Sequence, residues 1–494
     1  MDPKPWYRPF TTAALILAVT FLPRLLLLSK GPFHYDTLDL MVCMRSKAFT
    51  DHAVMFTLPS FLMIALAYLR DALWPAVTDL SLVLVTTAGV ASLAAVVIYA
   101  VLRKVLTESA AVAYALVTSF FPVFFSITTF GRIDHALAFV FLPLCLYYLL
   151  QRKWFACAVY TGLSIASRPE AAFALSGFFI WAACDVFEAK AIPLKTKLWS
   201  ITKAVLILFF VSALVWLGLS FALGRRMWFD QIVMNLMAKQ FGKKDPLDTV
   251  VILQVDIRKA FAHVLTVLRL LSVSSLFLAF GLFAKIRQKS VKDMLLFFVS
   301  FFVCLTLVAN FEMALNELRY LAVPVFFLAY FIAAGFEFVF KKAWRLFPAC
   351  LLCATAMLWP VAPTIYDRHQ RALQVDFARH LGEVTAPGSV IIAQDEWIFF
   401  KYYAGRDVII PPSLCVTNDW RPFFEKVSAV VVARRPLYFT YTAISYDYCH
   451  ILRKFIQKGF RAFLVDSYLN EDWHPDTIGR HVYREPIYLL VPNR

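Results

Sequence analysis

Long apolar runs recur along the whole sequence, and they constrain the fold more than any other feature. A run of about 20 apolar residues is long enough to cross a bilayer as a helix. Hydrophobic residues make up 61% of the 494 and charged residues only 17%, which excludes an ordinary soluble domain. We therefore predict a polytopic α-helical membrane protein with about eleven transmembrane helices. The predicted spans are 9–28, 79–102, 109–129, 136–150, 155–167, 170–187, 201–223, 262–285, 293–311, 320–340 and 345–364.

The segment 53–69 is also apolar, and its assignment decides the topology. Counting it as a span would invert every later loop, whereas placing it along the membrane surface puts the basic short loops on one side. Lys and Arg are enriched in short cytoplasmic loops, so we prefer the surface helix. The N-terminus is then inside and the C-terminus outside, with outside loops at 30–78 and 224–262. The basic loops that face the cytoplasm are 103–104, 152–153, 190–197, 285–292 and 341–345.

The composition changes at about residue 365, where charged residues reach the density of a soluble protein. Short β-rich runs alternate there with helical stretches at 370–382 and 441–458, which is typical of a small α/β domain. No Gly-x-Gly-x-x-Gly follows a strand, so we assign no nucleotide site. We predict a transmembrane catalytic domain over 1–364 and an extracytoplasmic α/β domain over 365–494. The predicted strands are 389–393, 407–410, 429–433, 462–465 and 488–491.

A polar stretch, residues 30–39, directly follows the first apolar span and carries Asp36 and Asp39. Acidic groups at the mouth of a membrane helix are costly, so they mark either a site or a pairing. Asp36 is our candidate catalytic carboxylate. The alternative is that both carboxylates simply end the helix in water. Asp39 lies on the same helical face as Asp36, where it caps the helix or supports Asp36.

Three arginines at helix ends on the predicted outer side are candidate phosphate ligands: Arg132, Arg168 and Arg319. The planar guanidinium fork matches the oxygens of a phosphate group. Each arginine also has a structural interpretation. Arg168 would pair with Glu170 across the helix break at Pro169, and Arg319 would reach toward the membrane interface.

Asp134 lies two residues after Arg132, which leaves three roles open. It would position a substrate, bind a metal ion together with Asp36, or pair with Arg132. Transfer of a sugar from a lipid phosphate needs positive charge on the departing phosphate and one base for the acceptor. With Asp36 as that base and a single displacement, the product has inverted configuration.

The order of these motifs resembles the GT-C superfamily of membrane glycosyltransferases, closest to the protein O-mannosyltransferase and lipid A aminoarabinose transferase type. In those enzymes an outside loop with an acidic residue follows the first helix, and a surface segment comes next. Two helices later comes an Arg/Ser-rich turn that ends in Asp. It is followed by a short helix pair with a basic residue at its break, and by a late helix that opens in Arg-Tyr and contains a Pro. The paired Asp-Glu of the family is Asp36-Thr37 here. The matching positions are Tyr35-Asp36, 51–59, 130–134, Arg168, Arg319-Tyr320 and Pro324.

The resemblance implies that a sugar moves from a polyprenyl-phosphate donor to a lipid, polysaccharide or protein acceptor on the non-cytoplasmic face. Metal dependence varies within the superfamily, so a divalent metal stays open. We predict a multi-pass protein of the bacterial inner membrane. The net charge of +16 is spread over the loops and indicates no nucleic-acid partner. The catalytic candidates are Asp36 and Asp134, and the substrate-binding candidates are Tyr35, Asp39, Arg132, Arg168, Glu170, Arg319 and Tyr320.

Two other classes of function compete with the transferase. A transporter or lipid flippase would have broken helices in two matching halves. The chain has one such break at 167–170, and no second half repeats it. A membrane scaffold that only presents the C-terminal domain would tolerate neutral substitutions at Asp36 and Asp134.

Overall fold

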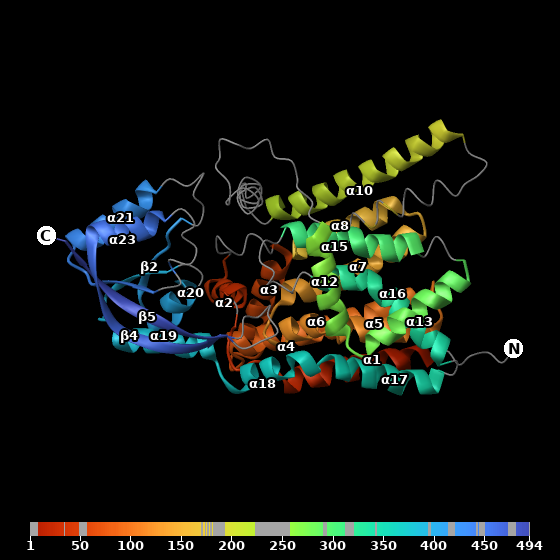
Figure 1. The fold of residues 1–494 in the computed structure, drawn as a ribbon, viewed down its shortest axis with the longest axis horizontal. Helices are drawn as coiled ribbons and strands as arrows, with labels where there is room; N and C mark the ends of the chain where they lie inside the picture. The colour runs from red at the N-terminus through yellow and green to blue at the C-terminus, as the bar shows by residue number, and fades with distance from the viewer. Residues whose placement is uncertain are drawn as a thin grey trace. The chain divides into compact units, whose positions relative to one another are not determined.

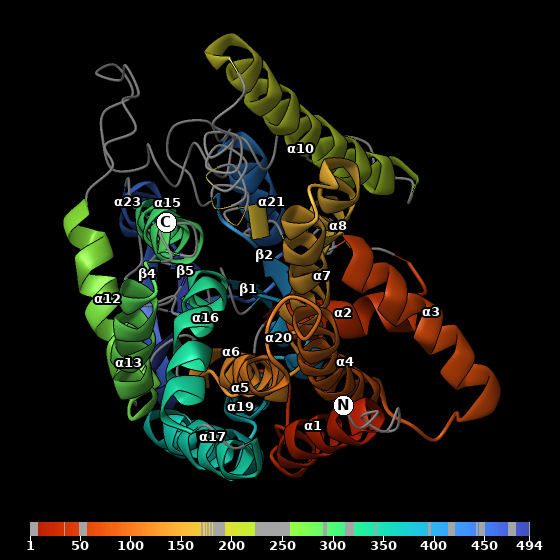
Figure 2. The ribbon, with the colours of Figure 1, turned by 90° about the vertical axis from the view of Figure 1, so that its right-hand side faces the viewer.

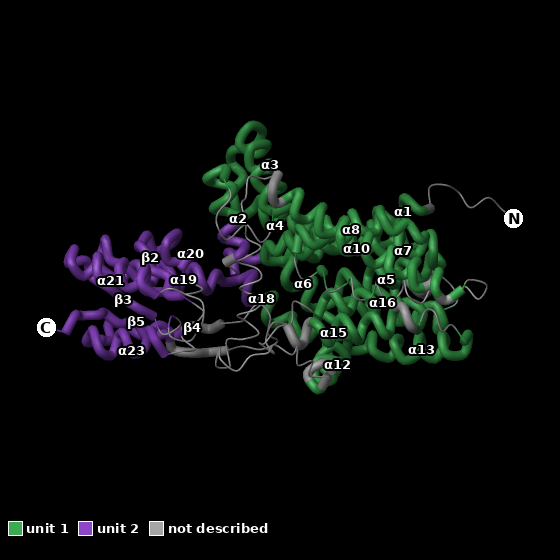
Figure 3. The backbone as a smooth tube through the Cα atoms, turned by 90° about the horizontal axis from the view of Figure 1, so that it is seen from above, with its two compact units in different colours: residues 1–28, 40–228, 254–366 green, residues 29–39, 229–253, 367–494 purple. Residues whose placement is uncertain are grey.

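The computed structural model divides the chain into two compact units by its internal contacts (Figure 3). The first unit comprises 1–28, 40–228 and 254–366, and the second comprises 29–39, 229–253 and 367–494. The structure describes residues 8–33, 35–48, 57–168, 171–172, 174, 177, 180, 193–222, 257–289, 294–311, 321–340, 343–393, 397–412, 420–440, 443, 450–472 and 481–493.

The first unit is a bundle of helices (Figures 1 and 2). Its polytopic helical class is as predicted, and the chain is an integral membrane protein. Helices α2 and α18 each run across the boundary with the second unit. The elements are α1 (Arg8–Leu26), α2 (Tyr35–Ser46), α3 (Thr57–Leu73), α4 (Asp79–Leu102), α5 (Glu108–Ser119), α6 (Pro122–Thr129), α7 (Ile133–Leu150), α8 (Trp154–Ser167), α10 (Leu194–Ala222), α12 (Ile257–Leu271), α13 (Ser274–Arg287), the π-helix η4 (Met294–Val299), α15 (Ser300–Phe311), α16 (Ala322–Val339), α17 (Ala343–Met357), the 3-10 turn η6 (Trp359–Val361) and α18 (Ala362–Gln370).

Six helices in the described part are long and apolar enough to cross a bilayer, or eight if each of two bent pairs is one span. Helix α8 and the segment 297–307 are apolar but shorter. The predicted span 170–187 and the predicted loop 224–262 lie largely outside the described residues. The apolar segment 53–69 forms α3, and its placement along the membrane surface stays a prediction.

Two predicted straight spans are bent. Helices α5 and α6 meet at 57°, where Pro122 opens α6 and cannot donate the hydrogen bond that would continue α5. The prediction of one continuous helix over 262–285 is wrong, because α12 and α13 meet at 112°. Ser272 at this break has a φ of 49°, a left-handed conformation that an α-helix cannot contain.

Helices α13 and α16 cross with their backbones in close approach at two glycines. A Cβ atom on Gly281 would clash with the carbonyl of Phe331, and one on Gly335 with the carbonyl of Phe277. The rings of Phe277 and Phe336 stack beside this crossing, with centroids 3.8 Å apart. Small residues let membrane helices approach this closely and gain dispersion contacts.

We expect Gly335→Ala to destabilise the protein by about 1–3 kcal/mol, because the added methyl group must push α13 and α16 apart. SDS-driven unfolding in mixed micelles measures this loss. Gly218→Ala on α10 is the matched control, since a Cβ there meets nothing within 4 Å. That control should gain about 0.5–1 kcal/mol from better helix propensity. A loss of equal size in both variants would contradict the close crossing.

The second unit contains a five-stranded sheet of order β2-β1-β3-β5-β4, so the predicted α/β domain is present. Strands β1, β2 and β3 are parallel, and β5 runs antiparallel to β3 and β4. Every residue of β1 and β3 is buried, as expected for strands covered on both faces. The elements are α19 (Leu373–Val384), β1 (Val390–Ile392), α20 (Trp397–Phe399), the π-helix η7 (Phe400–Ala404), β2 (Asp407–Ile409), α21 (Arg421–Val432), β3 (Leu437–Thr440), α23 (Ile451–Gly459), β4 (Phe460–Asp472) and β5 (His481–Pro492).

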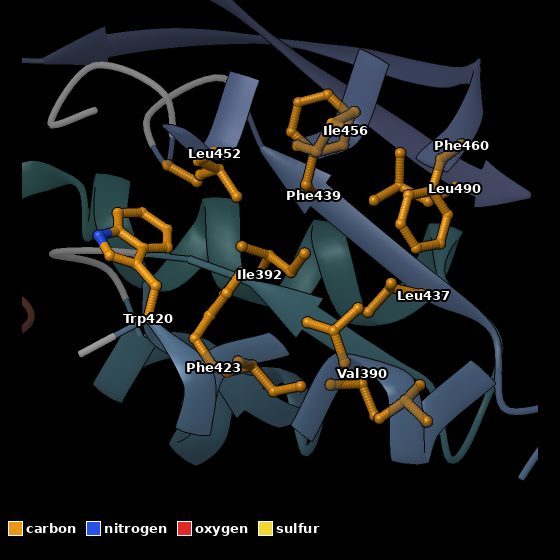
Figure 4. Packing of buried hydrophobic residues seen from close by; sticks show 14 residues of the cluster. Val390, Ile392, Trp420, Phe423, Leu437, Phe439, Leu452, Ile456, Phe460 and Leu490 are labelled. Carbon is orange, nitrogen blue, oxygen red and sulfur yellow. The ribbon is translucent and has the colours of Figure 1, made fainter. Parts of the chain in front are cut away.

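One predicted strand of this unit is wrong. Residues 429–433 lie at the end of helix α21, and the missed strand is β3. Pro422 is at the start of α21, a position that favours a helix, and Val427 and Val430 are buried at helical spacing. Figure 4 shows the core in which side chains of β1, β3 and β5 pack against residues of α21 and α23.

Candidate functional site

The α7–α8 hairpin brings two distant polar segments together in the first unit. Helix α7 follows the turn 130–132, where Gly131 has a φ of 95°, and α8 ends at Ser167. The two helices pack against each other, and the Ser164 hydroxyl donates to the carbonyl of Ala138 at 3.2 Å. Because the connection is short, the helices run antiparallel, and the start of α7 lies beside the end of α8.

Arg132, Asp134 and Arg168 form a buried charged cluster at this point. Arg132 donates from Nε to Oδ1 of Asp134 at 3.1 Å and from Nη2 to Oδ2 at 2.8 Å. Arg168 donates from Nη1 to the same Oδ2 at 2.9 Å. The three side chains are between 1 and 4% exposed. His135 lies next to them, with Nε2 at 3.9 Å from Oδ2 of Asp134.

The cluster places two guanidinium groups on one carboxylate, so these three groups sum to one positive charge. Asp134 also lies in the first turn of α7, where the helix dipole adds partial positive charge. Burial strengthens each of these interactions, because little water screens them. A guanidinium has five N–H donors, and Asp134 accepts two from Arg132 and one from Arg168. The Asp134 carboxylate therefore holds the two guanidinium groups next to each other inside the bundle.

Arg24 is a buried cation that the sequence analysis did not single out. Its Nε donates to the Thr128 hydroxyl at 2.9 Å and Nη1 to the carbonyl of Thr20 at 2.8 Å, and Nη2 donates to Ser119. The guanidinium carbon lies 4.6 Å from the centroid of the Phe125 ring. These bonds fasten α1 to α5 and α6, just before the turn that carries Arg132. An arginine in the last turn of an apolar helix was the available signal.

Asp36 and Asp39 belong to the second unit. Asp36 is in the first turn of α2. Asp36 and Asp39 are both buried, with exposed surface fractions of 3% and 1%. They therefore do not end the helix in water. The preceding loop packs on the chain around Arg368, whose carbonyl accepts from the backbone N–H of Lys30 at 2.9 Å. The Arg368 guanidinium lies over the ring of Phe33 at 5.4 Å.

Three predicted substrate contacts, Glu170, Arg319 and Tyr320, lie outside the described residues. Tyr35 begins α2, and its side chain is also outside the described part. Of the residues that the structure describes, no group of three or more His, Cys, Asp or Glu side chains is arranged to hold a metal ion. The roles assigned to the individual site residues stay predictions.

Comparison with known proteins adds the fold relationship. No protein-family model and no curated protein sequence matches the chain. Two crystal structures of ArnT from Cupriavidus metallidurans do match it, one bound to undecaprenyl phosphate and one in the apo state, with TM-scores of 0.57 and 0.53. The chain has the fold of ArnT. Each alignment covers 97% of both chains at 10% sequence identity.

ArnT is the lipid A aminoarabinose transferase of the GT-C superfamily, the type that the motif order resembles. The predicted resemblance is therefore confirmed at the level of the fold. The alignment includes both the helical bundle and the C-terminal sheet domain, because it leaves only 3% of the chain unmatched.

Proposed function

We propose that this protein is an inverting membrane glycosyltransferase that uses a polyprenyl-phosphate sugar as donor. The observation that carries the proposal is the buried cluster of Arg132, Asp134 and Arg168 in a chain with the ArnT fold. One of the matching ArnT structures binds undecaprenyl phosphate, the lipid phosphate that such a transfer would release.

In the proposed reaction, the acceptor hydroxyl or amine attacks the anomeric carbon of the sugar. The bond from that carbon to the phosphate oxygen breaks, and the phosphate leaves on its lipid as a monoester. Asp36 takes the proton of the acceptor as general base. A single displacement inverts the anomeric configuration. The phosphate is already a competent leaving group, so the reaction does not require a general acid.

Arg132 and Arg168 are proposed to stabilise the charge that develops on the departing phosphate. Electrostatic groups that are already oriented act without reorganisation during the reaction. Asp134 is proposed to hold both guanidinium groups in position. Further substrate contacts are proposed for the remaining predicted residues, which are Tyr35, Asp39, Glu170, Arg319 and Tyr320.

The reaction is proposed to occur on the non-cytoplasmic face of a bacterial inner membrane, with the C-terminal domain on that side. Single cysteines at Lys30 and Lys153, both exposed, test this in a cysteine-free background. Lys153 follows α7 at the end opposite to Asp134. We expect a membrane-impermeant thiol reagent to label position 30 in intact cells and position 153 only after permeabilisation. Labelling of both positions in intact cells would contradict the proposed sidedness.

Arg168→Lys tests the proposed phosphate contact. We expect the KM for the donor to rise by about tenfold or more, because lysine keeps the charge but loses the planar fork. The assay follows sugar transfer from undecaprenyl-phosphate-linked donors by the purified protein in proteoliposomes. Arg287→Lys is the control, since Arg287 is exposed at the end of α13.

The control variant should keep the KM of the unaltered protein. An unchanged KM in Arg168→Lys, with normal folding, would contradict phosphate binding by Arg168. If the purified protein transfers sugar from none of the lipid-linked donors but moves the lipid across the bilayer, the flippase alternative replaces the transferase.

A further inference from the structure

The first unit contains a cavity that is separate from the charged cluster. It has a volume of about 380 Å³ and lies where α4 ends at Leu102 and α7 ends at Leu150. Asp134 is at the other end of α7, which is 18 residues long. An α-helix rises 1.5 Å per residue, so about 24 Å of helix separates Asp134 from Leu150. The cavity therefore does not belong to the proposed active site.

One cationic and one anionic side chain line this cavity. Lys285 extends from the last turn of α13, and Glu337 from the last turn of α16. The Lys285 ammonium lies 4.8 Å from the centroid of the Tyr330 ring, which stacks on Phe297 at 3.8 Å. This stacking packs the Tyr330 ring of α16 against η4. Glu337 has no ion-pair partner in the described part of the chain.

The rest of the lining is mostly apolar, and it includes side chains from the ends of α4 and α7. Thr107, the N-cap of α5, also lines the cavity, and its hydroxyl accepts from the N–H of Ala110. The cavity is at the end of the bundle that the basic loops 103–104 and 285–292 predict to be cytoplasmic. With the predicted topology, a cavity at this end of the bundle would lie at the level of lipid headgroups.

We propose that this cavity binds the headgroup of an amine-bearing zwitterionic phospholipid. Lys285 would contact the phosphate, and Glu337 would accept hydrogen bonds from the ammonium group, with the Tyr330 ring beside it. The volume lies within the range of small-molecule sites, about 300–1,000 Å³. This inference does not depend on the proposed transferase activity.

The pair of charges also provides selectivity. An anionic headgroup such as phosphatidylglycerol would satisfy Lys285 but would bring a hydroxyl-rich group, without a cation, against the Glu337 carboxylate. The half-buried Glu337 carboxylate would then accept hydrogen bonds from neutral hydroxyl groups only, which are weaker than those from an ammonium group, and this difference sets the selectivity. The lining therefore favours phosphatidylethanolamine over phosphatidylglycerol.

Native mass spectrometry of the full chain in detergent tests the proposal with defined lipids. We expect phosphatidylethanolamine to bind about tenfold more tightly than phosphatidylglycerol with the same acyl chains, which corresponds to one hydrogen bond to a charged group. Soluble phosphoethanolamine is the third probe, and it should bind more weakly than the lipid. Equal affinity for the two lipids would overturn the proposal without the need for any variant. Phosphoethanolamine that binds as tightly as the lipid would assign the cavity to a soluble ligand instead.

Two variants test whether Glu337 and Lys285 set the preference for phosphatidylethanolamine. Glu337→Gln should abolish the preference for phosphatidylethanolamine, whereas Lys285→Gln should weaken the binding of both lipids. Arg287→Gln is the matched control, because it removes an exposed charge two residues after Lys285 and outside the cavity lining, and it should leave the preference unchanged. A preference that persists in Glu337→Gln would place the lipid elsewhere.

Discussion

Asp36→Asn is expected to lower the rate of sugar transfer by about 100- to 10,000-fold, the usual contribution of a general base. Asn has nearly the same shape as Asp, so it fits the buried site at the start of α2, but it cannot accept the acceptor's proton. The loss should appear in kcat and kcat/KM together, because the base acts only in the transition state. Transfer kinetics in proteoliposomes measure both constants.

Asp39→Asn is the matched control for this prediction. Asp39 is three residues further along α2 and is equally buried, and it is assigned a supporting role. Its substitution should lower the rate by less than that of Asp36. Thermal unfolding must show that both variants are folded. If Asp36→Asn turns over at a rate close to that of the unaltered protein, Asp36 is not the base.

Asp134→Asn is expected to destabilise the protein by about 3–5 kcal/mol, the cost of breaking a buried ion pair by removing one partner. The substitution removes the carboxylate that accepts three hydrogen bonds from Arg132 and Arg168 and leaves both guanidinium groups buried. SDS-driven unfolding in mixed micelles measures the loss. Donor binding should weaken as well, because the two guanidinium groups lose their orientation.

Asp71→Asn provides a control with similar chemistry at an exposed place. Asp71 also receives two cations, Lys47 at 2.6 Å and Arg70 at 2.6 Å, but its side chain is 46% exposed. Those neighbours lower the pKa of Asp71, chiefly through the hydrogen bond from Lys47. Solvent screens the charges of an exposed ion pair, so this variant should lose little stability. Equal losses in both variants would show that burial does not set the cost at Asp134.

A double variant measures how much the pairing of Asp134 with Arg168 contributes to the free energy of unfolding. Asp134→Asn leaves the buried Arg168 guanidinium without its counter-ion. Adding Arg168→Gln removes that uncompensated charge. The two substitutions together should therefore destabilise by less than the sum of their separate effects. Strict additivity would indicate that the pairing of Asp134 with Arg168 contributes nothing to stability.

Local sequence determined the boundaries and caps of some of the helices. The predicted span 79–102 coincides with α4 because an unbroken apolar run begins just after a capping residue, Thr78, whose hydroxyl accepts from the N–H of Ser81. The pairing of Arg132 with Asp134 was also open to prediction, since the two residues are neighbours in one turn. The class of the C-terminal domain followed from alternating short strands and helices.

Tertiary packing decided the rest, because the decisive partners are far apart in the chain. Arg168 meets Asp134 across 34 residues only because α7 and α8 pack side by side, and Arg24 meets Ser119 across 95 residues. The apolar run at 429–433 is compatible with either a strand or a helix by its composition. Its helical conformation depends on the burial of one face of α21. Periodicity and capping act over a few residues, whereas burial of Asp36 and Asp134 depends on neighbours that no local pattern specifies.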